Sequence, residues 1–441
     1  MAQRLLAQLS CAAWVVTLLL GAATAHAQDN GELDRRSQDP ADRHLGGPAA
    51  IDSSLRNGGD GLFLPEPDVE LDLPDFESPI APPTDEPEPS YWEQVELRLE
   101  GRARTGLGHD TNVFRADRGA TGDGFVHARG ELEFLAEFPN GSEVFAELTA
   151  ETRDYFERHD ADEQFGAVFL ESFHPVTDWL DAGGQLTLEY SRLNLLNDNG
   201  DLLPRGRFGS LDAEPRGYVI WRPLTAMALE GGLSYRYKDY EENRGVDSLD
   251  YTERRFDTSL SYKLSRDPRS RVKLKYRFRH RDYRELRARG RSGFLQPNSP
   301  RLDLYRHQLS LTFYQELGFG EHRLRLITTF GGAYNHDIFE NDRSYREGSL
   351  GFRAQWWPVP ERTRIAFGLR GVARNFLVRQ PTESGGRLRH RLISVTLGVW
   401  QQLGELPIAV YVNGRALVWR SGDVREDYDR YLGEAGVEVF F

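Results

Sequence analysis

The sequence of 441 residues contains one cysteine, two methionines and no long apolar run beyond its first residues. Cys11 lies inside that first run, so a chain that loses the run has no thiol for a disulfide or a thiolate metal site. A membrane-spanning helix needs about 20 consecutive apolar residues, whereas 28% of all residues are charged. The single cysteine excludes cysteine chemistry, and the lack of further apolar runs excludes a bundle of membrane-spanning helices. The many Gly (43), Phe (24) and Tyr (18) residues favour a large β-sheet protein.

Residues 1–27 have the pattern of a secretory signal peptide. Arg4 supplies the positive charge, residues 12–20 form the apolar core, and Ala-His-Ala at 25–27 is a cleavage site of the A-x-A type. A transmembrane anchor is the alternative, but the core is short and small residues follow it. We therefore expect the mature chain to begin at Gln28.

Residues 28–90 form an acidic, proline-rich segment. They hold 16 Asp or Glu residues against 4 Arg, and prolines crowd the end of the segment. Such a composition buries too little apolar surface to offset its ordering entropy, which predicts a disordered periplasmic extension. Within it, residues 69–73 alternate apolar and acidic side chains and could add a short strand to the sheet edge of a periplasmic or lipoprotein partner. A solvated spacer is the plainer alternative.

From Trp92 to the last residue the sequence alternates between apolar and polar side chains. In 95–105, for example, apolar or small residues alternate with Glu96, Arg98, Glu100 and the arginines that follow. This period predicts strands with one apolar and one charged face. Sixteen such segments follow one another: 95–105, 126–136, 143–155, 164–173, 179–190, 214–222, 226–238, 253–264, 271–283, 303–317, 322–335, 346–357, 362–376, 389–402, 407–419 and 430–441.

The connections between these segments alternate in length. Short ones lie at 139–142, 174–178, 223–224, 265–270, 318–320, 358–361 and 404–406, and longer polar ones include 107–125, 191–213, 239–252, 284–302 and 420–429. Short periplasmic turns and long outer loops are typical of outer-membrane barrels. We predict an all-β fold for 91–441: an antiparallel up-and-down transmembrane barrel of about 16 strands with both termini on the periplasmic side. A soluble β-sandwich is the alternative.

Aromatic residues mark several expected strand ends. Phe173, Trp221 and the pair Trp356-Trp357 stand just before turn prolines, where we expect their rings at the boundary between membrane and water. The sequence ends on alternating apolar residues with Phe441 last, which resembles the signal by which the barrel assembly machinery recognises outer-membrane barrels. Outer-membrane lipid and that machinery are therefore the expected partners, and nothing suggests nucleic acid.

A barrel of this size leaves an aqueous lumen, so its inward residues carry the candidate function. We expect an anion-binding wall of Lys273, Lys275, Arg277, Arg279, Arg281, Arg325, Arg353, Arg370 and Arg374, and an opposing acidic arc that includes Glu131, Glu133, Glu147 and Glu151. Arcs of opposite sign would set up a transverse field, and Arg suits carboxylate, phosphate or sulfate. This predicts a conduit for anions. The alternative is that the charges only line the water and hold the shape through ion pairs between facing arcs.

Loops suggest two further features and no enzymatic site. The leucines of 191–213 are easiest to understand if this loop folds inward as a constriction, and the arginines of 284–302 could form a basic external collar. His-Asp pairs at 109–110, 159–160 and 336–337 are the only catalytic candidates, and no serine, zinc or EF-hand motif accompanies them. We expect no enzyme activity, no cofactor and no metal.

One short string carries a family resemblance. Residues 108–115 (GHDTNVFR) resemble the D-[ST]-N-[VI]-F element of outer-membrane barrel porins found beside exopolysaccharide biosynthesis machinery. Asp110 and Asn112 also suit a tight turn at the barrel rim. The resemblance implies a channel for polysaccharide export with a periplasmic or lipoprotein partner at 28–90. A general diffusion porin and a non-conducting barrel that anchors an envelope complex are the competing hypotheses.

Overall fold

The computed structural model describes residues 94–114, 120–193, 208–240, 249–265, 269–290, 294–360, 362–381, 386–423 and 427–441. The predictions for the signal peptide, for the acidic segment 28–90 and for an inward fold of the loop within 191–213 lie outside these residues. Within the described part of the chain, no helix is long and apolar enough to cross a membrane.

Sixteen strands and one short 3-10 turn, η2 (His159–Ala161), make up the described structure. The strands are β1 (Glu96–Asp110), β2 (Asp123–Glu137), β3 (Glu143–Tyr155), β4 (Glu163–Thr177), β5 (Leu180–Leu193), β6 (Phe208–Leu224), β7 (Met227–Tyr240), β8 (Tyr251–Ser265), β9 (Ser270–Arg287), β10 (Arg301–Phe319), β11 (His322–Asp337), β12 (Tyr345–Val359), β13 (Thr363–Phe376), β14 (Arg389–Gln402), β15 (Ile408–Ser421) and β16 (Tyr428–Phe440).

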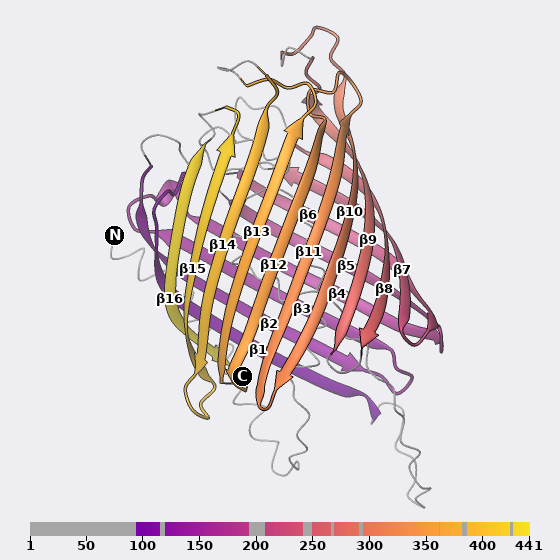
Figure 1. The fold of residues 1–441 in the computed structure, drawn as a ribbon, viewed down its shortest axis with the longest axis vertical. Coiled ribbons are helices and arrows are strands. Elements are labelled where there is room, and N and C mark those ends of the chain that lie inside the picture. The colour runs from indigo at the N-terminus through magenta and orange to yellow at the C-terminus, as the bar shows by residue number, and fades with distance from the viewer. Residues whose placement is uncertain are drawn as a thin grey trace, which may run out of the picture.

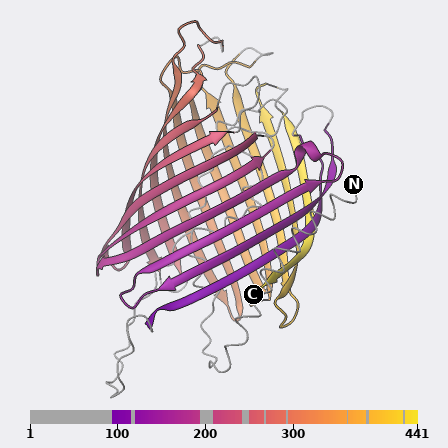
Figure 2. The same ribbon diagram turned by 180° about the vertical axis from the view of Figure 1, so that it is seen from behind.

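The strands close into one antiparallel barrel in which each strand pairs with its neighbours in the sequence. Figure 1 shows the wall of β10–β16 in front, and Figure 2 shows the opposite wall from behind. The seam is formed by β1 and β16, which pair from Arg102 opposite Phe440 to Asp110 opposite Leu432. The prediction of an up-and-down barrel of 16 strands is confirmed.

The last residue completes the seam. Phe441 donates its backbone N–H to the Gly101 carbonyl at 2.9 Å, and Gly101 donates back to Phe441 at 2.8 Å. A Cβ at Gly101 would lie only 2.3 Å from the Phe441 ring. A side chain at position 101 would therefore force the Phe441 ring to move.

The two faces of the barrel differ as the period-two pattern predicts. Leu97 and Leu233 are 66% exposed on the outer face, whereas Glu131 and Arg281 on the inner face are each 5% exposed. An apolar exterior on a closed barrel suits lipid, because closure leaves no unpaired strand edge. The architecture places the chain in the bacterial outer membrane. In such barrels the short turns lie on the periplasmic side, and we orient this one accordingly.

The strands reach further outward than the sequence pattern predicted. β6 already begins at Phe208, opposite Leu193, and β9 continues to Arg287. The predicted loops 107–125, 191–213, 239–252 and 284–302 were therefore too long. The physical reason is that outward residues at these ends, such as Arg254 and Arg284, are polar and exposed. The strands project beyond the hydrocarbon, where the apolar alternation is lost.

The interfacial aromatic residues were predicted only in part. Trp221 and Trp356 face outward and are 43% and 44% exposed. Trp357 and Phe173 face inward instead, because adjacent strand residues point to opposite faces and Phe173 shares the face of the buried Glu171. The rim turn is confirmed, since the Asn112 N–H donates to Asp110 Oδ1 at 3.0 Å.

Candidate functional site

The inner face of β1–β7 forms an acidic wall. The strand registers bring its carboxylates onto one face among fewer cations. Its acids are Glu96, Glu100, Asp110, Asp123, Glu131, Glu133, Glu137, Glu143, Glu147, Glu151, Glu163, Glu171, Asp181, Glu189, Asp212, Glu214 and Glu230. Its cations are Arg98, Arg102, Arg104, Arg129, Arg153, Arg216, Arg222, Arg236 and Lys238.

The four acids predicted for the opposing arc all lie on this wall and have local partners. Glu131 forms ion pairs with Arg102 and Arg129. Glu133 accepts a hydrogen bond from Arg102 at 3.0 Å. Glu147 accepts one at 2.8 Å from the hydroxyl of the threonine two residues later. These carboxylates are therefore held by neighbours on the same wall.

A buried histidine joins this wall to the end of the chain. His127 on β2 lies 2.9 Å from Glu151 on β3 through Nε2, and 2.7 Å from Glu434 on β16 through Nδ1. Glu434 also accepts a hydrogen bond from the Tyr411 hydroxyl on β15 at 2.5 Å. Sequence analysis missed this group, because its residues are separated by up to 307 positions and meet only when the barrel closes.

The inner face of β8–β15 forms a basic wall. Its cations are Arg255, Lys263, Arg271, Lys273, Lys275, Arg277, Arg279, Arg281, Arg306, Arg323, Arg325, Arg353, Arg364, Arg370, Arg374 and Arg415. Its acids are Glu253, Asp257, Glu316, Asp337 and Glu347. Because the barrel closes in sequence order, the two walls face each other.

The ladder predicted on β9 lies entirely on the inner face, but its members differ in their surroundings. Arg281 donates to Glu253 at 2.8 Å and its guanidinium lies 4.1 Å from the Tyr251 ring centroid. Arg279 is also buried, whereas Lys273, Lys275 and Arg277 are partly exposed. Lys273 lies 3.9 Å from Glu230. The outer end of the ladder is thus fully buried, and its periplasmic end is only partly buried.

Carboxylates flank the basic wall near its two ends. Towards the outer end, Glu347 accepts hydrogen bonds from Arg306 at 2.9 Å and from Arg374 at 2.8 Å. Towards the periplasmic end, Glu316 lies 3.5 Å from Arg325. Two of the predicted arginines, Arg325 and Arg374, are therefore paired.

Between these levels lie three inward arginines that we call the middle arginines: Arg353 on β12, Arg370 on β13 and Arg415 on β15. The sequences of β13, β14 and β15 contain no Asp or Glu. Gly368 and Thr396 separate Arg353 from Arg415 in one cross-strand row. Arg415 was missed by sequence analysis, although its parity in the strand would have identified it.

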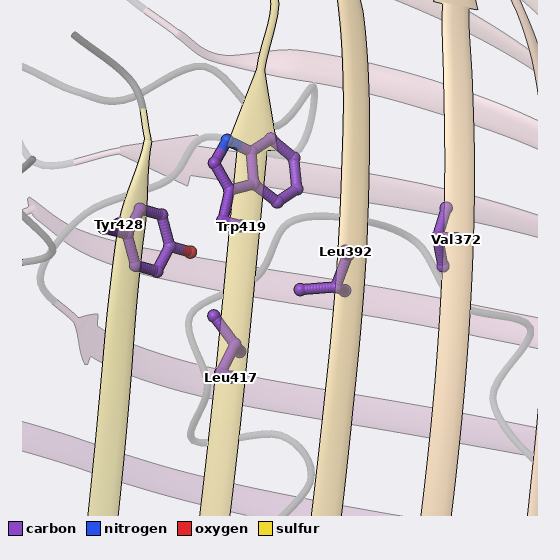
Figure 3. Close-up of a cluster of buried hydrophobic side chains, with 5 residues drawn as sticks. All are labelled: Val372, Leu392, Leu417, Trp419 and Tyr428. Carbon is purple, nitrogen blue, oxygen red and sulfur yellow. The ribbon is translucent and has the colours of Figure 1, made fainter. Parts of the chain in front are cut away.

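The outer end of the inner face carries buried apolar clusters among its charged residues, which the sequence analysis did not predict. Five side chains form one buried cluster on β13–β16, shown in Figure 3: Val372, Leu392, Leu417, Trp419 and Tyr428. Similar clusters elsewhere at this end include loop residues such as Val113 and Leu388. The reason is that the strands project beyond the membrane here and the outer loops pack against their inner face.

Arginines inside this outer layer are fixed in a recurring arrangement with a carboxylate and a tyrosine. Arg430 donates to Asp110 at 2.8 Å, and the Tyr155 hydroxyl donates to the same carboxylate at 3.0 Å. Arg374 pairs with Glu347 and lies 4.1 Å from the centroid of the Tyr345 ring. Such arginines stabilise the outer end and are unsuited to mobile anions.

The His-Asp pairs do not assemble into a catalytic group. His109 and His336 face the opposite side of their strands from Asp110 and Asp337. His159 lies in η2, and its Nδ1 is 3.9 Å from the carboxylate of Asp162 rather than paired with Asp160. Among the described residues, no group of three or more His, Cys, Asp or Glu side chains is arranged to hold a metal ion.

The fold and its inner walls define a transmembrane outer-membrane barrel with two oppositely charged lumen walls. The chain is similar in structure to an anion-selective porin from Comamonas acidovorans (TM-score 0.40, 12% identity, 79% of this chain and 100% of that one). It is also similar to OprB of Pseudomonas putida (TM-score 0.45, 10% identity, 79% and 95%) and to OccAB1 of Acinetobacter baumannii (TM-score 0.41, 10% identity, 79% and 97%). No family model and no curated protein matches the sequence. At these values the comparisons assign no substrate to the chain.

Proposed function

We propose that the barrel is a porin-like channel whose lumen prefers anions. The observation that carries this proposal is the lack of any Asp or Glu on β13, β14 and β15, where Arg370 and Arg415 face inward opposite the acidic wall. The excess positive charge is thereby concentrated on one side. An arginine fork suits carboxylate, phosphate and sulfate groups.

The middle arginines are close enough to act together. Arg353 and Arg415 lie three strands apart, which corresponds to about 14 Å at about 4.8 Å per strand, with Arg370 between them. Arg370 lies two residues along from that row, opposite Gly351 and Ser394, which places it about 8 Å from Arg353 and about 12 Å from Arg415. These separations are comparable with the ~8 Å Debye length of physiological salt. A solute moving along this wall would pass from the field of one guanidinium into that of the next.

The test is the reversal potential of the purified barrel in planar bilayers under a KCl gradient. We expect anion preference, and a shift towards cations when the middle arginines are replaced together in Arg353→Gln, Arg370→Gln and Arg415→Gln. Arg254→Gln, on the outer face of β8, is the control and should change nothing. Absence of conductance would favour the anchoring role through 28–90, and conductance without ion preference would favour a general diffusion porin.

A narrower form of the proposal is export of an anionic exopolysaccharide. Its support is the string 108–115, which resembles barrels found beside polysaccharide biosynthesis machinery. If the narrower form is correct, replacing the middle arginines should reduce polymer outside the cell while the barrel still assembles. Unchanged polymer together with altered ion preference would restrict the function to small anions. We further propose that the chain has no enzymatic activity.

A further inference from the structure

A pocket of about 500 Å³ lies at the outer end of β12–β14. Four arginines contribute to its lining, and none of its lining residues is acidic: Arg346, Asn375, Phe376, Leu377, Arg387, Arg389 and Arg391. We propose that this pocket binds the phosphate groups of an anionic glycolipid in the outer leaflet. The site is independent of conduction.

The strand register places the basic lining on the lipid side. Arg346, Asn375 and Arg389 are directly paired across three neighbouring strands. All three are exposed, whereas the next inward-facing residues, Glu347 and Arg374, are buried. Arg387 and Arg391 lie two residues before and after Arg389. The four arginines therefore belong to one outward patch. In it Arg389 and Arg391 are about 7 Å apart along β14, and Arg346 lies two strands, about 10 Å, from Arg389.

The arginines have no partner within the described protein. No hydrogen bond or ion pair joins the side chains of Arg346, Arg387, Arg389 or Arg391 to another described residue. Four positive charges that have no partner among the described residues repel one another unless an anion lies between them. Arginine forks bind phosphate oxygens in bidentate geometry. One multiply charged ligand would satisfy several of them together.

The position along the strands identifies a lipid as this ligand. Ile393, two residues from Arg391 on the same outer face, is 53% exposed, and Leu350, four residues from Arg346, is 44% exposed. The arginines therefore lie where the apolar belt ends, which is the level of lipid headgroups. A charge costs about 0–1 kcal/mol near this interface against about 2–4 kcal/mol at the midplane. A glycolipid would place its phosphates on the arginines and its acyl chains along the apolar belt.

The test is native mass spectrometry of the full-length barrel in detergent, titrated with bis-phosphorylated lipid A or with its dephosphorylated form. We expect the phosphorylated lipid to bind. The combined variant Arg387→Gln, Arg389→Gln and Arg391→Gln should bind it at least about tenfold more weakly, because three charge-assisted contacts are lost. The control is Arg254→Gln, an exposed outward arginine on β8, and it should bind as the parent does.

Four further measurements test the proposal against folding defects and against other ligands. Heat-dependent gel mobility reports whether each variant is a closed barrel, and Arg346→Lys, which keeps the charge and loses the fork, provides a second, milder variant with an expected intermediate affinity. Equal binding of the dephosphorylated lipid, or full binding by the combined variant, would overturn the proposal. Soluble polyphosphate that binds as tightly as lipid A would also overturn it and indicate a soluble polyanion instead. Conductance of the same variants should be unchanged.

Discussion

The acidic wall and the basic wall follow the same strand alternation but differ in how their charges are compensated. On the acidic wall, carboxylates and arginines share adjacent strands, so Glu131 and Glu133 meet Arg102 directly. On the basic wall, three consecutive strands carry arginine and no acid. The comparison shows that a lumen wall can carry many charges and still differ from another wall in how those charges are paired. The two walls therefore differ in net charge: acids outnumber cations on β1–β7, whereas cations outnumber acids on β8–β15.

The ion pairs also bear on the alternative in which the lumen charges only hold the barrel in shape, which stays a hypothesis. The pairs of Arg430 with Asp110, of Arg374 with Glu347 and of Lys273 with Glu230 join strands that are adjacent or two apart. They stabilise the local curvature of the wall. These ion pairs are thus made between neighbouring strands, and none of the three spans the lumen.

The largest effect should follow from breaking a compensated pair. In Asp110→Asn, Arg430 would keep its charge in a buried site at the seam without its carboxylate. Loss of one partner of a buried pair costs about 3–5 kcal/mol, so the urea midpoint for unfolding in detergent should fall markedly. Glu96→Gln, whose pair with Arg98 is exposed, should cost at most about 1 kcal/mol. Equal stability of the two variants would contradict the difference between buried and exposed pairs.

A smaller effect should separate the two ends of the β9 ladder. Arg281→Gln leaves the buried Glu253 with its remaining partner Arg255, which suggests a loss of about 2 kcal/mol in the free energy of unfolding. Arg277→Gln, at a partly exposed position, should leave stability nearly unchanged and shift the reversal potential towards cations. The opposite result, in which Arg281→Gln changes ion selectivity and Arg277→Gln changes stability, would contradict the difference between the buried outer end and the partly buried periplasmic end of the ladder.

The smallest effect is expected from adding a single carboxylate to the basic wall. Ser394→Glu places a carboxylate between the strands of Arg370 and Arg415, in register with Arg370. It should form the kind of neighbour pair seen on the acidic wall and lower the anion preference without affecting assembly. Ser394→Gln is the matched neutral control. Unchanged reversal potential in the glutamate variant would show that the middle arginines do not set the ion preference.

The strand positions in the sequence were predictable because lipid outside and water inside impose opposite polarity on alternate residues. The parity of Lys273 to Arg281, and of Arg353 and Arg370, follows directly from that rule. Where strands leave the membrane, the rule no longer applies. This is why β6 and β9 were longer than predicted and why the packed outer layer around Trp419 was not anticipated.

The sequence by itself determined the barrel, the approximate number of its strands and which residues face the lumen, since each depends on the alternation within single strands. Only the tertiary structure decided which charges are compensated. Glu434 meets His127, and Arg430 meets Asp110, because closure brings β16 beside β1. The outward arginine pocket likewise depends on the register of β12, β13 and β14. Pairing across strands is a property of the closed ring, and no single segment of the sequence records it.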